Sequence, residues 1–269
     1  MRDFRPAGFQ ELPVVVKNLL IINGLVFLLD NVLQSKGIAL DNYLALHYWG
    51  SPMFKWWQLI THMFMHGGFG HILSNMFALW MFGRILENMW GPQRFFIFYM
   101  VCGLGAALCH MSVLTFEFTR YSSAFLEYQS HPGFVEFMQF IKKFGVGINQ
   151  EGINYWQANR SDPGAIQASI NALNNHYLSL INTGTVGASG AVFGLLFAFG
   201  YYFPNMELYI YGILPLKAKY LVAGYAILEL SLGVANSAGD NIAHFAHIGG
   251  MIFAFLMLRM WKTNIRNNF

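Results

Sequence analysis

The sequence has 269 residues, of which 55% are hydrophobic and 11% charged, and its formal net charge is +3. Soluble domains usually carry about 25% charged residues, so the composition excludes an ordinary water-soluble protein and predicts a membrane protein. Because the basic residues form no cluster, we expect no nucleic acid among its partners. The two cysteines, Cys102 and Cys109, lie in one apolar segment; we predict free thiols and no metal framework based on cysteine.

The chain opens with a polar segment, residues 1–13, and an apolar stretch of about 20 residues follows it. That length predicts a first membrane span rather than the shorter core of a cleaved signal peptide. Five further apolar stretches approach the ~20 residues that a helix needs to cross a bilayer, and helix is expected because lipid cannot satisfy backbone polar groups. We predict an all-α bundle of six transmembrane helices, a single membrane domain over 1–269, with spans at Val14–Leu33, Gly70–Leu86, Phe95–Thr115, Val186–Phe203, Leu216–Ala235 and Ala243–Trp261.

The basic residues predict the orientation of these spans, because the segments on the cytoplasmic side of a membrane are enriched in Lys and Arg. If the N-terminus is cytoplasmic, the inner segments hold 10 of the 16 basic residues. Four of the other six lie in one long outer loop, where this rule carries little weight. We therefore expect both termini in the cytoplasm. The inner residues are Arg2, Arg5, Lys17, Arg84, Arg94, Lys217, Lys219, Arg259, Lys262 and Arg266.

Two outer segments are too long to be simple connections. Residues 34–69 are rich in Trp and Met, which favours a segment half-submerged at the membrane surface. Residues 116–185 are predicted to be an extramembrane helical insertion on the outer face. Apolar residues recur there at helical spacing after Pro132 and again from Ile166 to Ile181, so two amphipathic helices are expected.

A serine between small residues opens the fourth predicted span, in Gly187-Ala188-Ser189-Gly190. A nucleophilic serine needs such neighbours, because a substrate carbonyl must reach its oxygen and a backbone N–H must face the oxyanion. Gly190 and Gly194 form a small-xxx-small pair that lets another helix approach. Such a motif is also ordinary at contacts between membrane helices, so on its own it indicates packing as readily as catalysis.

Polar side chains also open the sixth and second predicted spans. His247 lies in Ala243-His244-Phe245-Ala246-His247-Ile248-Gly249-Gly250, and a histidine is suited to act as a general base near neutral pH. Gly250, one turn further, would let this span approach Ser189.

In the second span His71 and Asn75 are four residues apart and share a helical face, so both can donate toward one point, as an oxyanion site requires. Capping by the histidine and hydrogen bonding between helices by the asparagine are the structural alternatives.

Together these residues resemble the rhomboid family of intramembrane serine proteases. The resemblance covers spans two to six apart from the long insertion, and the order and spacing of the motifs agree. Two further matches flank span two. The matching pieces are His71-xxx-Asn75, Gly187-Ala188-Ser189-Gly190, Ala246-His247-xx-Gly250, Trp56-Trp57 with His62-Met63-Phe64-Met65-His66, and Gly83-Arg84-xx-Glu87-xx-Trp90-Gly91.

The resemblance implies that Ser189 is the nucleophile, that His247 is the base, and that His71 and Asn75 form the oxyanion site. It implies a serine endopeptidase of bacterial type that needs no cofactor, metal or catalytic aspartate, and no candidate for such an aspartate is evident. The implied partners are the lipid bilayer and membrane-anchored protein substrates. Six spans, no leader and few cysteines fit a bacterial inner membrane, with the membrane of an organelle as the alternative. His244 is a neighbour without an assigned role.

The sequence departs from the family pattern at three places. Gln58 follows Trp57 where many relatives have Arg, and this difference raises the question of how the interfacial segment is anchored. Ala254 replaces a frequent Gly, and the insertion at 116–185 has no counterpart in the smallest members.

Other functions are compatible with parts of the pattern. A non-catalytic membrane scaffold of the same fold is one, although such relatives usually lack the serine or the histidine. A histidine-rich metalloenzyme is another, but the HxxHH and HExxH motifs typical of such enzymes are absent. A transporter is disfavoured because no pair of Gly/Pro-broken spans occurs in matching halves. The ligands of the metalloenzyme would come from His62, His66, His71, His244 and His247.

Overall fold

The computed structural model describes residues 12–210, 214–235 and 243–266. Four of its helices are long and apolar enough to cross a membrane, and they coincide with four of the predicted spans. The third span was predicted to end at Thr115, but its helix continues without a break to Ser130. These four helices are α1 (Val14–Gln34), α6 (Pro92–Ser130), α11 (Ala218–Ala235) and α12 (His244–Arg266).

The other two predicted spans are helical but shorter or interrupted. The second consists of α4 (Phe69–Ala78), a π-helical turn η2 (Leu79–Gly83) and α5 (Arg84–Trp90), which follow one another directly. The fourth is α10 (Ser189–Tyr202), an apolar helix of 14 residues. The number of six spans therefore stays a prediction, and Arg2 and Arg5, used for the orientation, lie outside the described residues.

The segment predicted to lie at the membrane surface contains three short helical pieces, α2 (Asp41–Leu44), α3 (Gln58–Thr61) and the 3₁₀ turn η1 (His62–Phe64). A two-stranded antiparallel hairpin, β1 (Glu207–Ile210) and β2 (Leu214–Lys217), connects α10 to α11 and pairs Glu207 with Lys217. The sequence analysis did not predict this hairpin.

The long insertion folds as a helical hairpin on the end of α6. Both predicted amphipathic helices are confirmed as α7 (Phe134–Phe144) and α9 (Pro163–Ile181), and a third helix, α8 (Gln150–Ala158), lies between them. Because α6 runs through residue 116, the predicted start of the insertion does not coincide with a helix end. Aromatic residues from α6, α7 and α8 form its core with Leu173, a cluster separate from the core of the main bundle.

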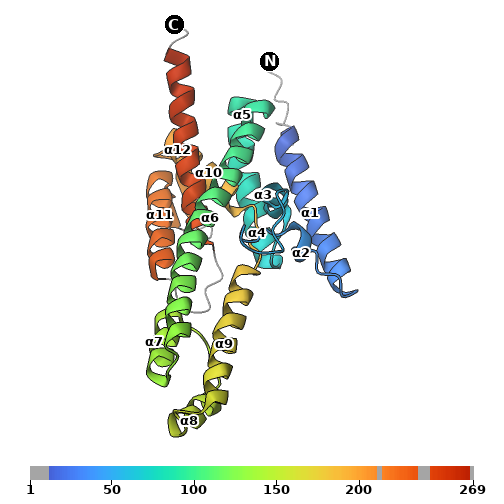
Figure 1. The fold of residues 1–269 in the computed structure, drawn as a ribbon. Helices are drawn as coiled ribbons and strands as arrows, with labels where there is room; N and C mark the ends of the chain where they lie inside the picture. The colour runs from blue at the N-terminus through green and yellow to red at the C-terminus, as the bar shows by residue number, and fades with distance from the viewer. Residues whose placement is uncertain (1–11, 211–213, 236–242, 267–269) are drawn as a thin grey trace, which may run out of the picture.

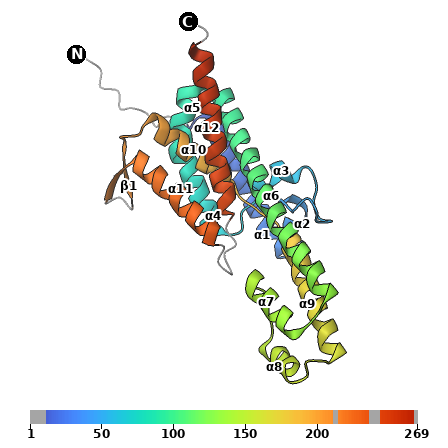
Figure 2. The ribbon, with the colours of Figure 1, turned by 60° about the vertical axis from the view of Figure 1, so that its left-hand side comes forward.

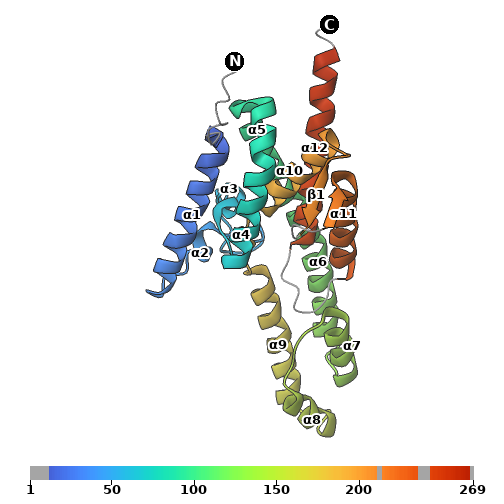
Figure 3. The same cartoon turned by 180° about the vertical axis from the view of Figure 1, so that it is seen from behind.

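The helices lie in an elongated arrangement with the insertion at one end. α1 begins and α12 ends at the end of the molecule opposite to α7, α8 and α9 (Figure 1). α7 packs against α6, while α9 continues alongside the lower half of α6 (Figure 2). Seen from behind, α1, the α4–α5 run, α10 with α12, and α11 succeed one another across the bundle (Figure 3).

The centre of the bundle is the contact between α6, α10 and α12. Small residues permit this close packing. A Cβ added at Gly250 would collide with the backbone oxygen of Gly190, and one added at Gly194 would lie 2.7 Å from the Cβ of Cys102. Ala254, a frequent Gly position in the resembling family, is completely buried in the same core.

Candidate active site

Ser189 is the first residue of α10, and the chain turns sharply before it. Gly187 adopts φ = 133°, a conformation that residues with a side chain rarely take. Its N–H donates to the carbonyl oxygen of His62 at 2.9 Å, which ties this turn to the segment before α4. Because the first N–H groups of a helix have no partner within the helix, the backbone N–H of Ser189 can donate to a ligand.

The side chains of Ser189 and His247 are in direct contact. The Oγ atom of Ser189 and the Nε2 atom of His247 are 2.8 Å apart, within the range of a hydrogen bond. His247 lies in the first turn of α12 and is buried. Its ring stacks on that of Phe193, one turn along α10 from Ser189, with centroids 4.2 Å apart and planes at 10°. The structure thus brings together the serine and the histidine singled out in the sequence, 58 residues apart.

Glu229 of α11 completes this cluster. Its Oε2 atom lies 2.8 Å from Nδ1 of His247 and 2.6 Å from Nδ1 of His244. The sequence analysis missed Glu229 and left His244 without a role. An acidic residue inside an apolar span is costly and usually functional, so the run Leu228-Glu229-Leu230 was the signal that could have revealed it.

His71 approaches the serine from α4, the helix that also carries Asn75. A Cβ added at Gly187 would lie 2.9 Å from Nε2 of His71 and 3.5 Å from Oγ of Ser189, so this glycine leaves open the space between the two. Asn75 is buried, and its amide nitrogen finds no hydrogen-bond acceptor among the described residues. A buried donor without a partner is unfavourable unless a ligand or water accepts from it. α4 therefore carries one imidazole near Ser189 and, four residues further on, a buried amide donor with no acceptor among the described residues.

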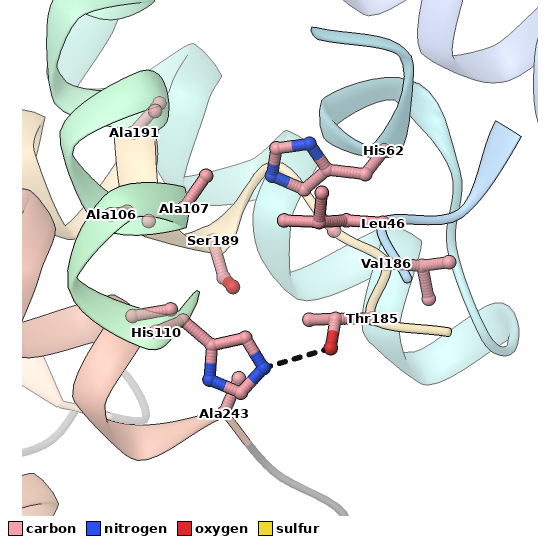
Figure 4. Close-up of a pocket in the computed structure, with 14 residues that line it drawn as sticks. Leu46, His62, Ala106, Ala107, His110, Thr185, Val186, Ser189, Ala191 and Ala243 are labelled. Carbon is pink, nitrogen blue, oxygen red and sulfur yellow. Dashed lines mark hydrogen bonds between the residues drawn. The ribbon is translucent and has the colours of Figure 1, made fainter. Parts of the chain in front are cut away.

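A small cavity lies beside Ser189, lined by residues of α6, α10, the segment before α4 and the segment after α9. Its volume of about 20 Å³ is roughly that needed by one water molecule. Figure 4 shows His62 and His110 on either side of Ser189, with His110 bonded to the hydroxyl of Thr185 at 2.9 Å. The Nδ1 atom of His62 is 2.8 Å from the carbonyl oxygen of Gln58 and must donate to it. Burial lowers the pKa of His62 to about 4, so its ring is neutral and Nε2 can accept a hydrogen bond.

Gln58 stands where many relatives have Arg, which raised the question of how the interfacial segment is anchored. Its side chain is fully buried and itself anchors that segment. Its Oε1 accepts from the backbone N–H groups of His47 and Lys55 at 3.2 and 3.1 Å. Its amide nitrogen donates to the carbonyl oxygens of Met53 and Tyr43 at 2.9 and 3.4 Å. The amide thus satisfies backbone groups of the short helix α2 and of the irregular chain that follows it.

The ligands suggested for a metalloenzyme do not gather in one place. Within the described part of the chain, the one group of three potential ligands consists of Glu229, His244 and His247. His66 and His71 approach each other edge to face, with ring centroids 5.1 Å apart, but do not belong to that group. Of the four glycines proposed for close packing, Gly190, Gly194 and Gly250 lie where α6, α10 and α12 meet, whereas Gly187 faces His71.

Comparison with known proteins agrees with the motifs. The family model described as the Rhomboid domain matches residues 53–123 and 164–262 and leaves out much of the helical hairpin. An uncharacterised rhomboid protein of Schizosaccharomyces pombe, named as mitochondrial, is 24% identical over 276 aligned positions, which cover 96% of this chain and 68% of the relative.

Proposed function

This chain belongs to the rhomboid family of multi-pass membrane proteins, and on that basis we propose that it is an intramembrane serine endopeptidase. The observation that carries the proposal is the hydrogen bond of 2.8 Å between Ser189 and His247. A serine hydroxyl is a weak nucleophile until an adjacent base takes its proton, and this pair has the required geometry. No cofactor or metal takes part in the proposed reaction.

In the proposed mechanism, Oγ of Ser189 attacks the scissile carbonyl while Nε2 of His247 takes the hydroxyl proton. The negative charge that develops on the carbonyl oxygen is stabilised by the N–H of Ser189 and by the side chains of His71 and Asn75. Loss of one such donor typically slows a reaction by about 10²–10³-fold. His247 then protonates the leaving amine as the C–N bond breaks, which leaves an acyl-enzyme.

Water must then reach the acyl group from the outer side. The cavity of about 20 Å³ beside Ser189 supports this step, since polar groups of His62, His110 and Thr185 face it and it has room for about one molecule. His247 takes a proton from that water as it attacks the ester, and returns the proton to Ser189 when the acyl group leaves.

The substrates are proposed to be membrane-anchored proteins, cut in or near a membrane helix that unwinds readily. Such substrates fit an active site formed where helices begin within a bilayer-spanning bundle. The helical insertion is proposed to gate or recruit them. α9 ends at Ile181, eight residues before Ser189, and α6 carries His110 at the cavity, so the insertion is linked to the site at both of its ends.

Six spans with both termini in the cytoplasm, in a bacterial inner membrane, complete the proposal. The start of α1 and the end of α12 lie at the same end of the molecule, opposite to the insertion, which supports this topology (Figure 1). The name of the relative favours a mitochondrial membrane instead. Single cysteines placed at either terminus should resist a membrane-impermeant alkylating reagent in intact cells, and labelling of one of them would contradict the topology.

The proteolytic activity is tested with purified protein and a generic transmembrane-helix substrate. Ser189→Ala and His247→Ala should each reduce cleavage by at least about 10³-fold, whereas EDTA should leave it unchanged. Ser112→Ala is the matched control, because that hydroxyl is exposed and donates only to the carbonyl of Leu108. Cleavage that survives in Ser189→Ala would overturn the mechanism. A folded wild type that cleaves no substrate and fails to react with a fluorophosphonate would favour the non-catalytic scaffold.

A further inference from the structure

Glu229 is a buried carboxylate and the one acidic residue of α11, a helix whose side chains are mostly apolar. Its neighbours Leu228 and Leu230 are about half exposed, while Glu229 itself is 7% exposed. Burying a carboxylate is costly unless hydrogen bonds or charges compensate for it. The compensation comes from two histidines of α12, which both direct Nδ1 at the same carboxylate oxygen.

We propose that Glu229 is the positioning residue of a Ser189–His247–Glu229 triad, an inference that rests on the proposed function. A carboxylate can only accept, so its bond to His247 requires a proton on Nδ1. The lone pair of the neutral ring is then on Nε2, which is the atom 2.8 Å from Ser189. Glu229 therefore selects the tautomer that can act as the base.

Glu229 also holds the ring in place and stabilises the charge that forms on it. The stack with Phe193 sets the plane of the His247 ring but leaves it free to flip by 180° about the Cβ–Cγ bond, which keeps the same plane. The hydrogen bond of 2.8 Å to Glu229 removes this freedom and aims Nε2 at Ser189. When His247 takes the serine proton, the negative carboxylate lies next to the new positive charge, which lowers the barrier to that step.

His244 gives the carboxylate a second donor. It lies three residues before His247 on α12, so both side chains reach Glu229 from one face of that helix. Two donors from one helix to one oxygen fix the position of the carboxylate between α11 and α12. His244 is thus part of the support of Glu229 rather than a second base at the serine.

The distances favour hydrogen bonds over a shared metal ion. In a tetrahedral zinc site with bonds of about 2.0–2.1 Å, neighbouring ligand atoms are separated by roughly 3.3 Å. The separations of 2.6 and 2.8 Å are shorter than this and match hydrogen bonds to a charged group.

The experiment compares the wild type with Glu229→Gln, Glu229→Asp and Ser231→Ala. Ser231 lies on the same helix and its exposed hydroxyl donates to the carbonyl of Ile227, so its removal should change nothing. The rate of Ser189 phosphonylation by a fluorophosphonate is measured against pH. We expect Glu229→Gln to be slower by about 10²–10⁴-fold, because the charged ring loses its partner. Glu229→Asp should recover part of the rate.

A second measurement detects the tautomer of His247 directly. Nitrogen NMR of ¹⁵N-histidine-labelled wild type should find the proton of neutral His247 on Nδ1, with Glu229→Gln shifting it partly to Nε2. A wild-type proton on Nε2, or a Glu229→Gln profile identical to that of the wild type, would overturn the inference. Stoichiometric zinc at these residues, with phosphonylation lost in EDTA, would also overturn it. A wild type with the Nδ1 proton and reactive Ser189 that cleaves no protein would instead refute the proposed protease function and leave the positioning by Glu229 intact.

Discussion

Single buried polar side chains hold the parts of this protein where the backbone lacks regular partners. Gln58 makes four hydrogen bonds to backbone groups of the interfacial segment. Glu87 serves the start of α1 in the same way. The residue before α1 is Pro13, whose side chain offers no cap, and the carboxylate of Glu87 accepts from the N–H groups of Val15 and Val16 at 2.9 and 2.8 Å. A negative group at this position also interacts favourably with the helix dipole.

Removal of Glu87 should therefore loosen α1 from the bundle. Glu87→Ala leaves two backbone donors without acceptors, and we expect a loss of about 2–4 kcal/mol in the free energy of unfolding. Glu87→Gln keeps one acceptor oxygen and should lose about half as much. Thermal unfolding in detergent measures the effect, with the exposed neighbour Asn88→Ala as control. Equal stability of Glu87→Ala and the control would show that α1 does not depend on this cap.

Helices α10 and α12 must be close for Ser189 to reach His247, and glycine makes this possible. The backbone of Gly190 lies where a side chain at Gly250 would be. Closely packed interiors respond to an added methyl group by shifting side chains and backbone. In this contact no flexible side chain can move aside, since the obstacle is backbone.

Gly250→Ala should consequently separate the two helices and impair both stability and activity. We expect a loss of about 1–3 kcal/mol in the free energy of unfolding and a decrease of at least about tenfold in cleavage. The matched control is Gly224→Ala on α11, where an added Cβ would meet nothing within 4 Å. Unfolding and cleavage are measured on both variants. A Gly250→Ala variant that behaves like the control would mean that the contact between α10 and α12 is wider than described.

The sequence allowed most helices to be predicted because apolar length and helical spacing are local signals. The stretch after Pro132 predicted α7, and the first apolar stretch predicted α1. α8 was missed because Gln150–Ala158 has no clear apolar stripe. The β hairpin was missed because its strands have only four residues each and are not marked by alternating hydrophobicity.

The candidate site was predictable in part. Ser189 and His247 were identified because each lies in a motif of small residues, and the structure places them within hydrogen-bond distance. Glu229 was not, because its relevance depends on how α11 packs against α12, which no spacing along the chain reveals. The role of Gln58 was unpredictable for a similar reason, since its four backbone partners lie in an irregular segment.

At the scale of the whole molecule, the helical hairpin and the main bundle have separate cores but share α6. Tyr121 of α6 donates from its hydroxyl to the carbonyl of Leu173 in α9 at 2.8 Å, and Tyr128 of α6 is hydrogen-bonded to Ser169 of α9. α6 and α9 thus pair directly, and α7 and α8 cover that pair. This arrangement allows α7 and α8 to be removed while α6 and α9 still connect to the catalytic bundle.

The proposed role of the insertion in gating or recruiting substrate can then be tested on an intact site. Residues 131–162, which contain α7 and α8, are replaced by a flexible linker between Ser130 and Pro163. If the insertion engages membrane-anchored substrates, cleavage of a full-length substrate should change by about tenfold or more, equivalent to roughly 1.4 kcal/mol. Cleavage of a short peptide should stay constant, because it reaches Ser189 without such contacts.

A decrease for the full-length substrate alone indicates recruitment, and an increase indicates that the insertion obstructs entry. Equal rates for both substrates before and after the deletion would contradict either role, while loss of both activities together with a lower unfolding temperature would show that the hairpin instead stabilises the bundle through α6.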